Sequence, residues 1–341
     1  MAAFKASRFV RLFALSLSCS LALAQKVIAA CTQQKNHRPI IGALCQETVT
    51  GLSALSPSYI AASCVKFLES GGSRVVPIRV GLSKSEYTDV FYSINGLFFP
   101  GGDVDLVTSA YAKAAKILFD LVMQANECGN YFPVWGECLG MHELAYLVAG
   151  ENLLTLTCTQ DVALPLNFTK ESKQSKLFRN FPKGVLDTLA SESTTGNMHN
   201  WSLSLKNFSA NEKLRNFYRV LTTNTDSSGV EFISTMEAYH YPVYALQWHP
   251  EMNPYEWANR RALVHSDGAI RAAFHMAAFL VSEAAKSAHR FSSQEEEERH
   301  LIYGHSPVYT AQLDLFQQAY FFDREITGRS REDCAPEPTE L

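Results

Sequence analysis

The sequence predicts an α/β fold: a three-layer αβα sandwich in which helices cover both faces of a mostly parallel central sheet. Three observations support this prediction. Short apolar runs alternate along the chain with segments of helical periodicity. The 341 residues are 47% hydrophobic and 19% charged, enough for a sizeable buried core. This composition excludes a disordered tail protein, a collagen-like repeat and a coiled coil.

The first half of the chain carries most of the alternation. Four short apolar runs bounded by polar residues, Gly or Pro predict buried strands at 39–44, 74–78, 96–99 and 131–135. Apolar residues at helical spacing predict helices at 58–70, 109–126 and 141–148. The first of these helices is expected to end at Gly71-Gly72, a typical C-terminal signal.

The second half is less regular. Short alternating runs between 153 and 230 indicate irregular strands and loops, followed by a strand at 243–248 and a helix at 269–285. The acidic run at 295–298 is typical of a solvated surface or a frayed end. Neither an internal repeat nor a linker interrupts the chain. We therefore expect a single domain over 25–325 and a C-terminal tail at 326–341.

Residues 1–24 have the pattern of a secretory signal peptide. Three basic residues without any acidic residue precede an apolar run at 12–23, which ends in a small-x-small motif; cleavage after Ala24 and cleavage after Ala30 are both open. A run of roughly a dozen residues is too short for a membrane span, which needs about 20. The sequence thus predicts a protein of the secretory route without a membrane segment.

Removal of this segment changes both charge and cysteine count. It takes away three positive charges and no negative one, so the net charge moves from −4 to −7, which argues against nucleic-acid binding. It also leaves seven of the eight cysteines, an odd number, so at least one thiol stays unpaired or pairs between chains. Three sequons, at Asn167, Asn200 and Asn207, predict N-glycosylation on the same secretory route.

Cys138 is the candidate nucleophile. It stands between Gly136 and Gly140, where a predicted strand turns into a predicted helix, as in the G-x-S-x-G nucleophile elbow. The start of the following helix favours negative charge and hence a thiolate. The Leu139 N–H is placed to stabilise an acyl oxyanion. A buried structural cysteine is the alternative interpretation of this motif.

His249 and Glu251 are candidates for the other two catalytic roles. His249-Pro250-Glu251 follows the strand predicted at 243–248. Acyl transfer by a thiol needs a base for the thiol proton and a carboxylate that fixes the tautomer of that base. An isolated His-Pro-Glu segment is also compatible with an ordinary loop, but its occurrence together with the elbow favours catalysis.

These motifs carry a family resemblance. Gly136-x-Cys138-x-Gly140, followed 111 residues later by His249, resembles class I glutamine amidotransferase domains. Pro100-Gly101-Gly102 is similar to the oxyanion loop of that family, which implies that the Gly102 N–H acts with that of Leu139. Further segments resemble the γ-glutamyl hydrolase family, and together the similarity covers about residues 38–287: they lie at 38–44, 58–63, 68–79 and 95–102.

The resemblance implies a class I glutamine amidotransferase-like fold and a γ-glutamyl peptidase that cleaves folyl-poly-γ-glutamates through a thioester. It also implies a secreted or lysosomal homodimer that uses neither a cofactor nor a metal. His199, in the segment 197–201, corresponds to a histidine near the active site of the family and is expected to bind substrate. The other candidate functions are a glutaminase-type amidotransferase subunit and a non-catalytic secreted glycoprotein of the same fold.

Two residues depart from the family pattern. Glu137 stands before the nucleophile, where a small or apolar residue is usual, and His142 stands where an acid is common. A carboxylate beside Cys138 would repel the thiolate unless Glu137 points away or is protonated, while a charged His142 would attract it. The alternative for Glu137 is a side chain that faces solvent or pairs with Lys or Arg.

Overall fold

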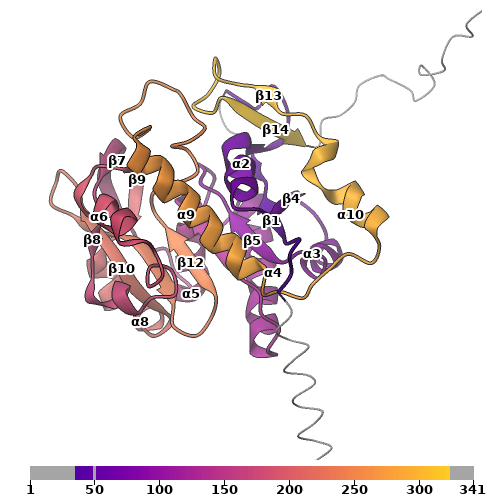
Figure 1. Cartoon of the computed structure of the whole chain (residues 1–341), viewed down its shortest axis with the longest axis horizontal. Coiled ribbons are helices and arrows are strands. Elements are labelled where there is room, and N and C mark those ends of the chain that lie inside the picture. Colours follow the sequence, from indigo (N-terminus) through magenta and orange to yellow (C-terminus); the bar gives the residue numbers. More distant parts are fainter. Residues whose placement is uncertain (1–34, 49–50, 323–341) are drawn as a thin grey trace, which may run out of the picture.

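The computed structural model describes residues 35–48 and 51–322 of the chain. The predicted signal peptide and C-terminal tail, with Cys31 and Cys334, lie outside the described residues. Within them, the α/β sandwich is confirmed: helices lie on both faces of a central sheet (Figure 1). None of the helices described has the length and apolar character needed to cross a membrane.

The central sheet has eight strands, and the five at one end are parallel. The remaining three add antiparallel pairings at the other end. In spatial order, the strands are β4 (Arg74–Ile78), β1 (Ile40–Leu44), β5 (Gly96–Phe99), β6 (Val134–Glu137), β12 (Val243–Leu246), β11 (Glu231–Ala238), β10 (Tyr218–Thr225) and β8 (Asn167–Phe168).

Alternating residues of each strand face two different hydrophobic cores. Ile40 of β1 packs into one core and Ile41 into the other. The helices that contribute to the first core are α3 (Lys84–Phe91), α4 (Ala110–Glu127), α5 (Leu139–Ala149), α7 (Leu205–Ala210) and α8 (Glu212–Phe217). Those of the second are α2 (Ala62–Ser70), α6 (Lys183–Ser191) and α9 (Asp267–Ala284).

Two small antiparallel sheets flank the sandwich. One, which we call the terminal sheet, joins β2 (Gln46–Glu47) and β3 (Ser58–Ala61) to β13 (Val308–Tyr309) and β14 (Gln318–Phe322). The other pairs β7 (Leu154–Leu164) with β9 (Thr195–Leu203). Three short helices complete the described part of the chain: η1 (Lys170–Gln174), α10 (Gln294–His300) and η2 (Ile302–Gly304).

Several predicted elements need correction. The helix expected from 58 begins at Ala62, because 58–61 forms β3 and pairs with β14 near the other end of the described chain. The strand expected at 131–135 lies at Val134–Glu137. The stretch 153–230 holds regular strands and helices, including the 11-residue β7. The acidic run lies in α10, none of whose residues is buried, so the predicted solvated surface is confirmed and the frayed end is not; Glu297 bonds the Arg74 side chain there.

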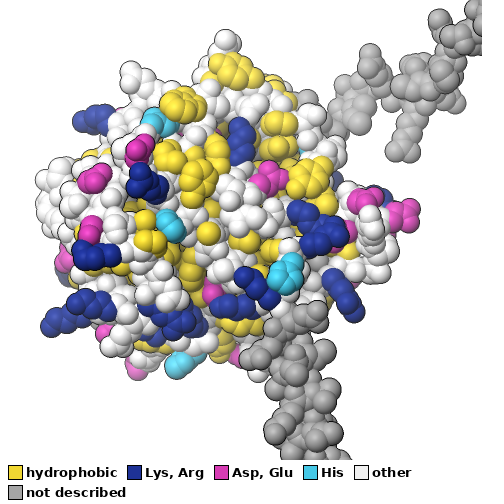
Figure 2. Space-filling model, in the orientation of Figure 1, with side chains coloured by type: hydrophobic (Ala, Val, Ile, Leu, Met, Phe, Trp, Pro, Cys, Tyr) yellow, Lys and Arg dark blue, Asp and Glu magenta, His cyan; other side chains and the backbone are white. Residues whose placement is uncertain are grey.

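The surface over α9 is mixed in character. Figure 2 shows this face, with hydrophobic side chains exposed among Lys, Arg, Asp and Glu side chains. Phe274 of α9 is among the large apolar residues that remain exposed. Charges of both signs are interspersed on this face, so it carries no single-sign field.

Glu143 of α5 makes the stability of the fold dependent on pH. Neither carboxyl oxygen has a hydrogen-bond partner among the described residues, and burial, with a smaller effect of Asp105, raises the pKa to about 8. A raised folded-state pKa means that stability falls as pH rises from about 4.5 to 8.

We therefore expect Glu143→Gln to stabilise the protein more at pH 8 than at pH 5, by roughly 3 kcal/mol. Urea unfolding of both forms at the two pH values measures the difference. The lowered pKa of the neighbouring His142 makes stability fall as pH falls, but only below pH 6.5. A comparison of the two forms above that pH therefore isolates the effect of Glu143. An equal effect at pH 6.5 and pH 8 would show that Glu143 does not titrate in this range.

Candidate active site

Cys138 occupies a strained turn between β6 and α5. Its φ of 49° and ψ of −104° lie outside the regions that L-residues favour. The turn is held by the Cys138 N–H, which donates to the Leu246 carbonyl of β12 at 2.8 Å. At Gly140 a Cβ atom would lie 2.0 Å from the Phe99 carbonyl oxygen, so the motif needs glycine there. This geometry is that of the predicted nucleophile elbow.

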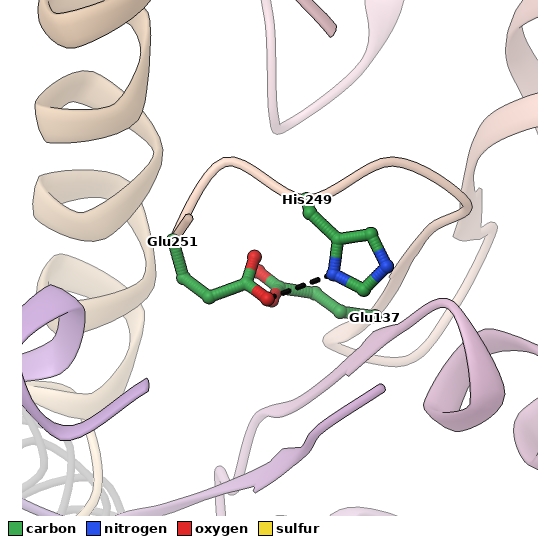
Figure 3. A group of neighbouring side chains, drawn as sticks. All are labelled: Glu137, His249 and Glu251. Atoms are coloured by element: carbon green, nitrogen blue, oxygen red, sulfur yellow. Dashed lines mark hydrogen bonds and ion pairs between the residues drawn. The ribbon is translucent and has the colours of Figure 1, made fainter. Parts of the chain in front are cut away.

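His249 and Glu251 follow the neighbouring strand β12 and lie at the same carboxyl edge of the sheet as Cys138. The His249 N–H donates to the Gly196 carbonyl at 3.1 Å, which fixes the loop. The two side chains are buried, and His249 Nδ1 lies 2.8 Å from Glu251 Oε1 (Figure 3). The structure therefore brings the three predicted catalytic residues together.

The electrostatics of this group favour an imidazolium. Burial alone would lower the pKa of His249, but the Glu251 carboxylate and the Cys138 sulfur, which is hydrogen-bonded to the ring, raise it well above its usual value. Burial likewise opposes ionisation of Glu251, yet His249 keeps its pKa below the ordinary value. A charged ring next to sulfur stabilises a thiolate and can return a proton to a leaving amine.

Gly101 and Gln46 shape the predicted oxyanion site. A Cβ atom at Gly101 would lie 2.6 Å from His249 Cε1 and 3.3 Å from Cys138 Cβ, so only glycine allows this close approach. The Gly101 carbonyl accepts from Gln46 Nε2 at 2.6 Å. In a trans peptide, C=O and N–H point in opposite directions, so the Gly102 N–H points away from Gln46. Leu139 is the first residue of α5, where N–H groups lack intrahelical acceptors.

Sequence reasoning missed Gln46 and Gly101. Gln46 lies two residues beyond the end of the predicted strand 39–44, at the edge where the catalytic residues gather. A polar residue just beyond the carboxyl end of a parallel strand is the signal that could have identified it. Gly101 belongs to the Pro100-Gly101-Gly102 loop, but its close approach to His249 depends on a segment about 150 residues away.

His199 of β9 lines the same cleft. Nδ1 lies 2.8 Å from Thr159 Oγ1 and 3.1 Å from Ser202 Oγ, and Nε2 lies 3.0 Å from Asn197 Oδ1. Burial, with smaller effects of His142 and His249, lowers its pKa well below the usual value. A neutral ring fixed by protein partners at both nitrogens suits positioning better than proton transfer.

His142 does not supply the positive charge considered from the sequence. Its Nε2 lies 2.8 Å from Gln247 Oε1. Burial lowers its pKa to about 4, an effect that the hydrogen bond with Gln247 only partly offsets. His142 is therefore neutral through most of the acidic range and all of the neutral range.

Glu137 faces neither solvent nor a basic residue. It is fully buried, its Oε1 accepts from Trp135 Nε1 at 2.8 Å, and among the described residues no Lys or Arg pairs with it. Its side chain meets Glu251 on the sheet face covered by α2 and α9 (Figure 3). Burial and Glu251 raise the pKa of Glu137 well above its usual value, so it is a neutral acid. Neutrality removes the repulsion of the thiolate that the sequence suggested.

Glu137, His249 and Glu251 also offer donor atoms within 4.8 Å of one another, a spacing that a metal ion could use. His249 Nδ1 and Glu251 Oε1 are, however, already bonded to each other. The arrangement is thus explained by proton sharing and needs no ion.

The catalytic residues open into a cleft of about 970 Å³. Trp201 and Leu313 line it while remaining 52% and 53% exposed, so its mouth is partly apolar. One wall consists of residues 311–316, between β13 and β14. Arg260 is the one Lys or Arg among the lining residues that the structure describes.

The three sequons differ in their surroundings. Asn167 on β8 and Asn200 on β9 are exposed, and Asn200 lines the cleft. The Asn207 amide instead donates to the Leu153 carbonyl at 2.9 Å and to Thr155 Oγ1 at 3.1 Å. Cys64, Cys128, Cys138 and Cys158 are free thiols in this structure. Glycosylation at the three sites stays a prediction.

Comparison with known proteins identifies the family of this chain. The model of the family described as peptidase C26 matches residues 39–251. The chain is 54% identical over 287 residues to the gamma-glutamyl hydrolase of Homo sapiens, covering 84% of this chain and 90% of that protein. It is 50% identical over 301 residues to the gamma-glutamyl hydrolase of Rattus norvegicus, covering 88% and 95%.

Among solved structures, a glutamine amidotransferase from Thermotoga maritima covers 74% of this chain and 100% of its own, with a TM-score of 0.43 and 13% identity. The family model spans the elbow, the oxyanion loop and the His-Pro-Glu segment. This chain belongs to the peptidase C26 family.

Proposed function

We propose that this protein is a cysteine-dependent γ-glutamyl peptidase that hydrolyses the γ-glutamyl bonds of folyl-poly-γ-glutamates. The observation that carries the proposal is the buried Cys138–His249–Glu251 group at the base of a large cleft, in a chain about half identical to gamma-glutamyl hydrolases. The chain is a hydrolase acting on γ-glutamyl bonds; the folate conjugate and the residue roles are our assignment.

Acylation begins with the thiolate of Cys138, which attacks the γ-carbonyl carbon of the substrate. The carbonyl oxygen becomes an oxyanion that accepts hydrogen bonds from the N–H groups of Leu139 and Gly102. His249 then gives its proton to the departing α-amine, the C–N bond breaks, and a γ-glutamyl thioester remains on sulfur. Glu251 stabilises the imidazolium and fixes the ring through Nδ1.

Deacylation repeats the sequence with water. His249, now neutral, takes a proton from a water molecule as its oxygen attacks the thioester carbon. The C–S bond breaks and leaves a thiolate, the γ-carboxylic acid product gives its remaining proton to solvent and departs as a carboxylate, and the proton on His249 restores the ion pair with the thiolate. Glycine at 101 matters throughout, because any side chain there would displace His249.

The cleft can take a substrate with an apolar end, although its lining holds one guanidinium among four aspartates, Asp103, Asp105, Asp161 and Asp314. Trp201 and Leu313 offer apolar surface at the mouth, and Arg260 offers a guanidinium to a substrate carboxylate. His199 stands beside the catalytic group as a positioning side chain. The proposal includes the secretory signal at 1–24, a secreted or lysosomal location, and a homodimer.

The test incubates the mature protein with pteroyl-pentaglutamate and, separately, with glutamine, at pH 5 and pH 7. Shortening of the polyglutamate chain without ammonia release from glutamine is the expected result. Ammonia release from glutamine as the main reaction would identify a glutaminase instead. A protein inert to both substrates would be a non-catalytic member of the family.

A further inference from the structure

A second carboxyl group, that of Glu137, lies beside the His249–Glu251 pair. Glu137 ends β6, and period-two alternation places it on the same sheet face as Trp135, whose indole N–H it accepts. Its carboxyl group and that of Glu251 lie together beside the His249 ring (Figure 3). Glu137 Oε2 and Glu251 Oε2 are both buried, and neither oxygen has a donor among the described residues.

These two orphan oxygens explain each other. Two carboxylates this close in a buried site cannot both be charged, so one of them holds a proton. Glu251 is bonded to the His249 ring, which favours its anion, whereas Glu137 has no cation bonded to it among the described residues. The proton therefore resides on Glu137, which donates it as a hydrogen bond to Glu251.

We propose that Glu137 is a positioning residue: as a neutral acid it donates a hydrogen bond to Glu251 and thereby holds Glu251, and through it His249, in the catalytic orientation. This inference rests on the proposed function. The chain of contacts runs from Trp135 Nε1 to Glu137, from Glu137 to Glu251, and from Glu251 to His249 Nδ1 at 2.8 Å.

The surroundings of Glu137 show why its ionisation would matter. The titratable groups that face it are Glu251 and His249 from the loop after β12, and Cys64 from α2. Burial, then Glu251 and Glu137, raise the pKa of the Cys64 thiol well above its usual value, so this thiol remains neutral. When pH rises enough to ionise Glu137, its donor is lost and two adjacent anions repel, which releases Glu251 from its position.

Two variants separate the proton from the volume it occupies. Glu137→Gln keeps an acceptor for Trp135 and supplies an N–H donor to Glu251 that does not titrate. Glu137→Met has similar volume but no donor. Glu256→Gln is the matched control: this buried carboxyl, whose pKa is raised to about 7 chiefly by burial, lies near Cys64 and Glu251 but bonds the Gln317 N–H.

The measurement is kcat/KM for pteroyl-pentaglutamate from pH 4 to pH 9. Glu137→Gln should keep activity within about threefold at pH 5 and shift the alkaline limb upward by about one pH unit or more. Glu137→Met should lose about ten- to a hundredfold in kcat at pH 5, with KM little changed, as expected for a lost orienting bond. The limb of Glu256→Gln should stay where it is in the wild type.

Alkylation of Cys138 by iodoacetamide, followed by mass spectrometry of its peptide, reads the Cys138–His249 pair without any substrate. At pH 6 Glu137→Gln should match the wild type, and Glu137→Met should react several-fold more slowly. If the wild type did not cleave pteroyl-pentaglutamate but the alkylation rates were as expected, the proposed function would be refuted and the role of Glu137 would stand. Two results would overturn the role of Glu137. One is a pH profile of kcat/KM for Glu137→Gln that coincides with that of the wild type, and the other is an alkylation rate of Glu137→Met equal to that of Glu137→Gln.

Discussion

Replacing Cys138 with alanine will lower kcat by about 10⁵-fold or more, because it removes the atom that forms the thioester. The fold should survive the change. Cys138 is a buried free thiol, and alanine at this position would bear the same backbone strain at φ of 49° that cysteine already bears. Turnover of pteroyl-pentaglutamate and the unfolding midpoint of the variant together check the prediction.

Cys64→Ala is the matched control for that experiment. Cys64 is also a buried free thiol, but it lies in α2 on the face of the sheet covered by α2 and α9. Its loss should cost at most about 1–2 kcal/mol of stability and leave the turnover of folded protein near normal. Near-normal turnover by Cys138→Ala would exclude the covalent mechanism.

Replacing His249 with alanine should lower kcat by about 10³–10⁴-fold, near the upper range for a general acid–base. The same change at His199 should lower kcat much less. The buried neutral ring of His199 is hydrogen-bonded to Asn197, Ser202 and Thr159, which leaves it no proton to exchange with the Cys138 sulfur. Parallel measurement of kcat for both variants at pH 5 and pH 7 checks the order. If the two losses were equal or reversed, the base would have to be reassigned to His199.

The central strands and the elbow could be predicted because their signals are local. A short apolar run identifies β1 or β5 without knowledge of the adjacent strands, and the two glycines around Cys138 predict the tight turn. The terminal sheet could not be predicted in this way. Ala61 lies opposite Ala319, so β3 is a strand only because a partner from the far end of the described chain pairs with it.

The same distinction applies within the site. Cys138, His249 and Glu251 belong to motifs, and these motifs predict both their roles and their proximity, of which the structure shows the proximity. The partner of Glu137 lies on another strand's loop, more than a hundred residues away, and sequence spacing does not reveal that pairing. The sequence left Glu137 either beside the Cys138 thiolate or turned toward solvent or a basic residue, and only the fold brings its carboxyl group to Glu251.

The terminal sheet also determines when the substrate cleft is complete during protein synthesis. The strands that carry the catalytic groups all precede residue 250, whereas the cleft wall at 311–316 is held between β13 and β14. Because a chain is made from its N-terminus, nucleophile and base emerge from the ribosome well before that wall. Loss of residues 308–322 would leave Cys138, His249 and Glu251 in place, remove one side of the cleft and expose the edge of β3.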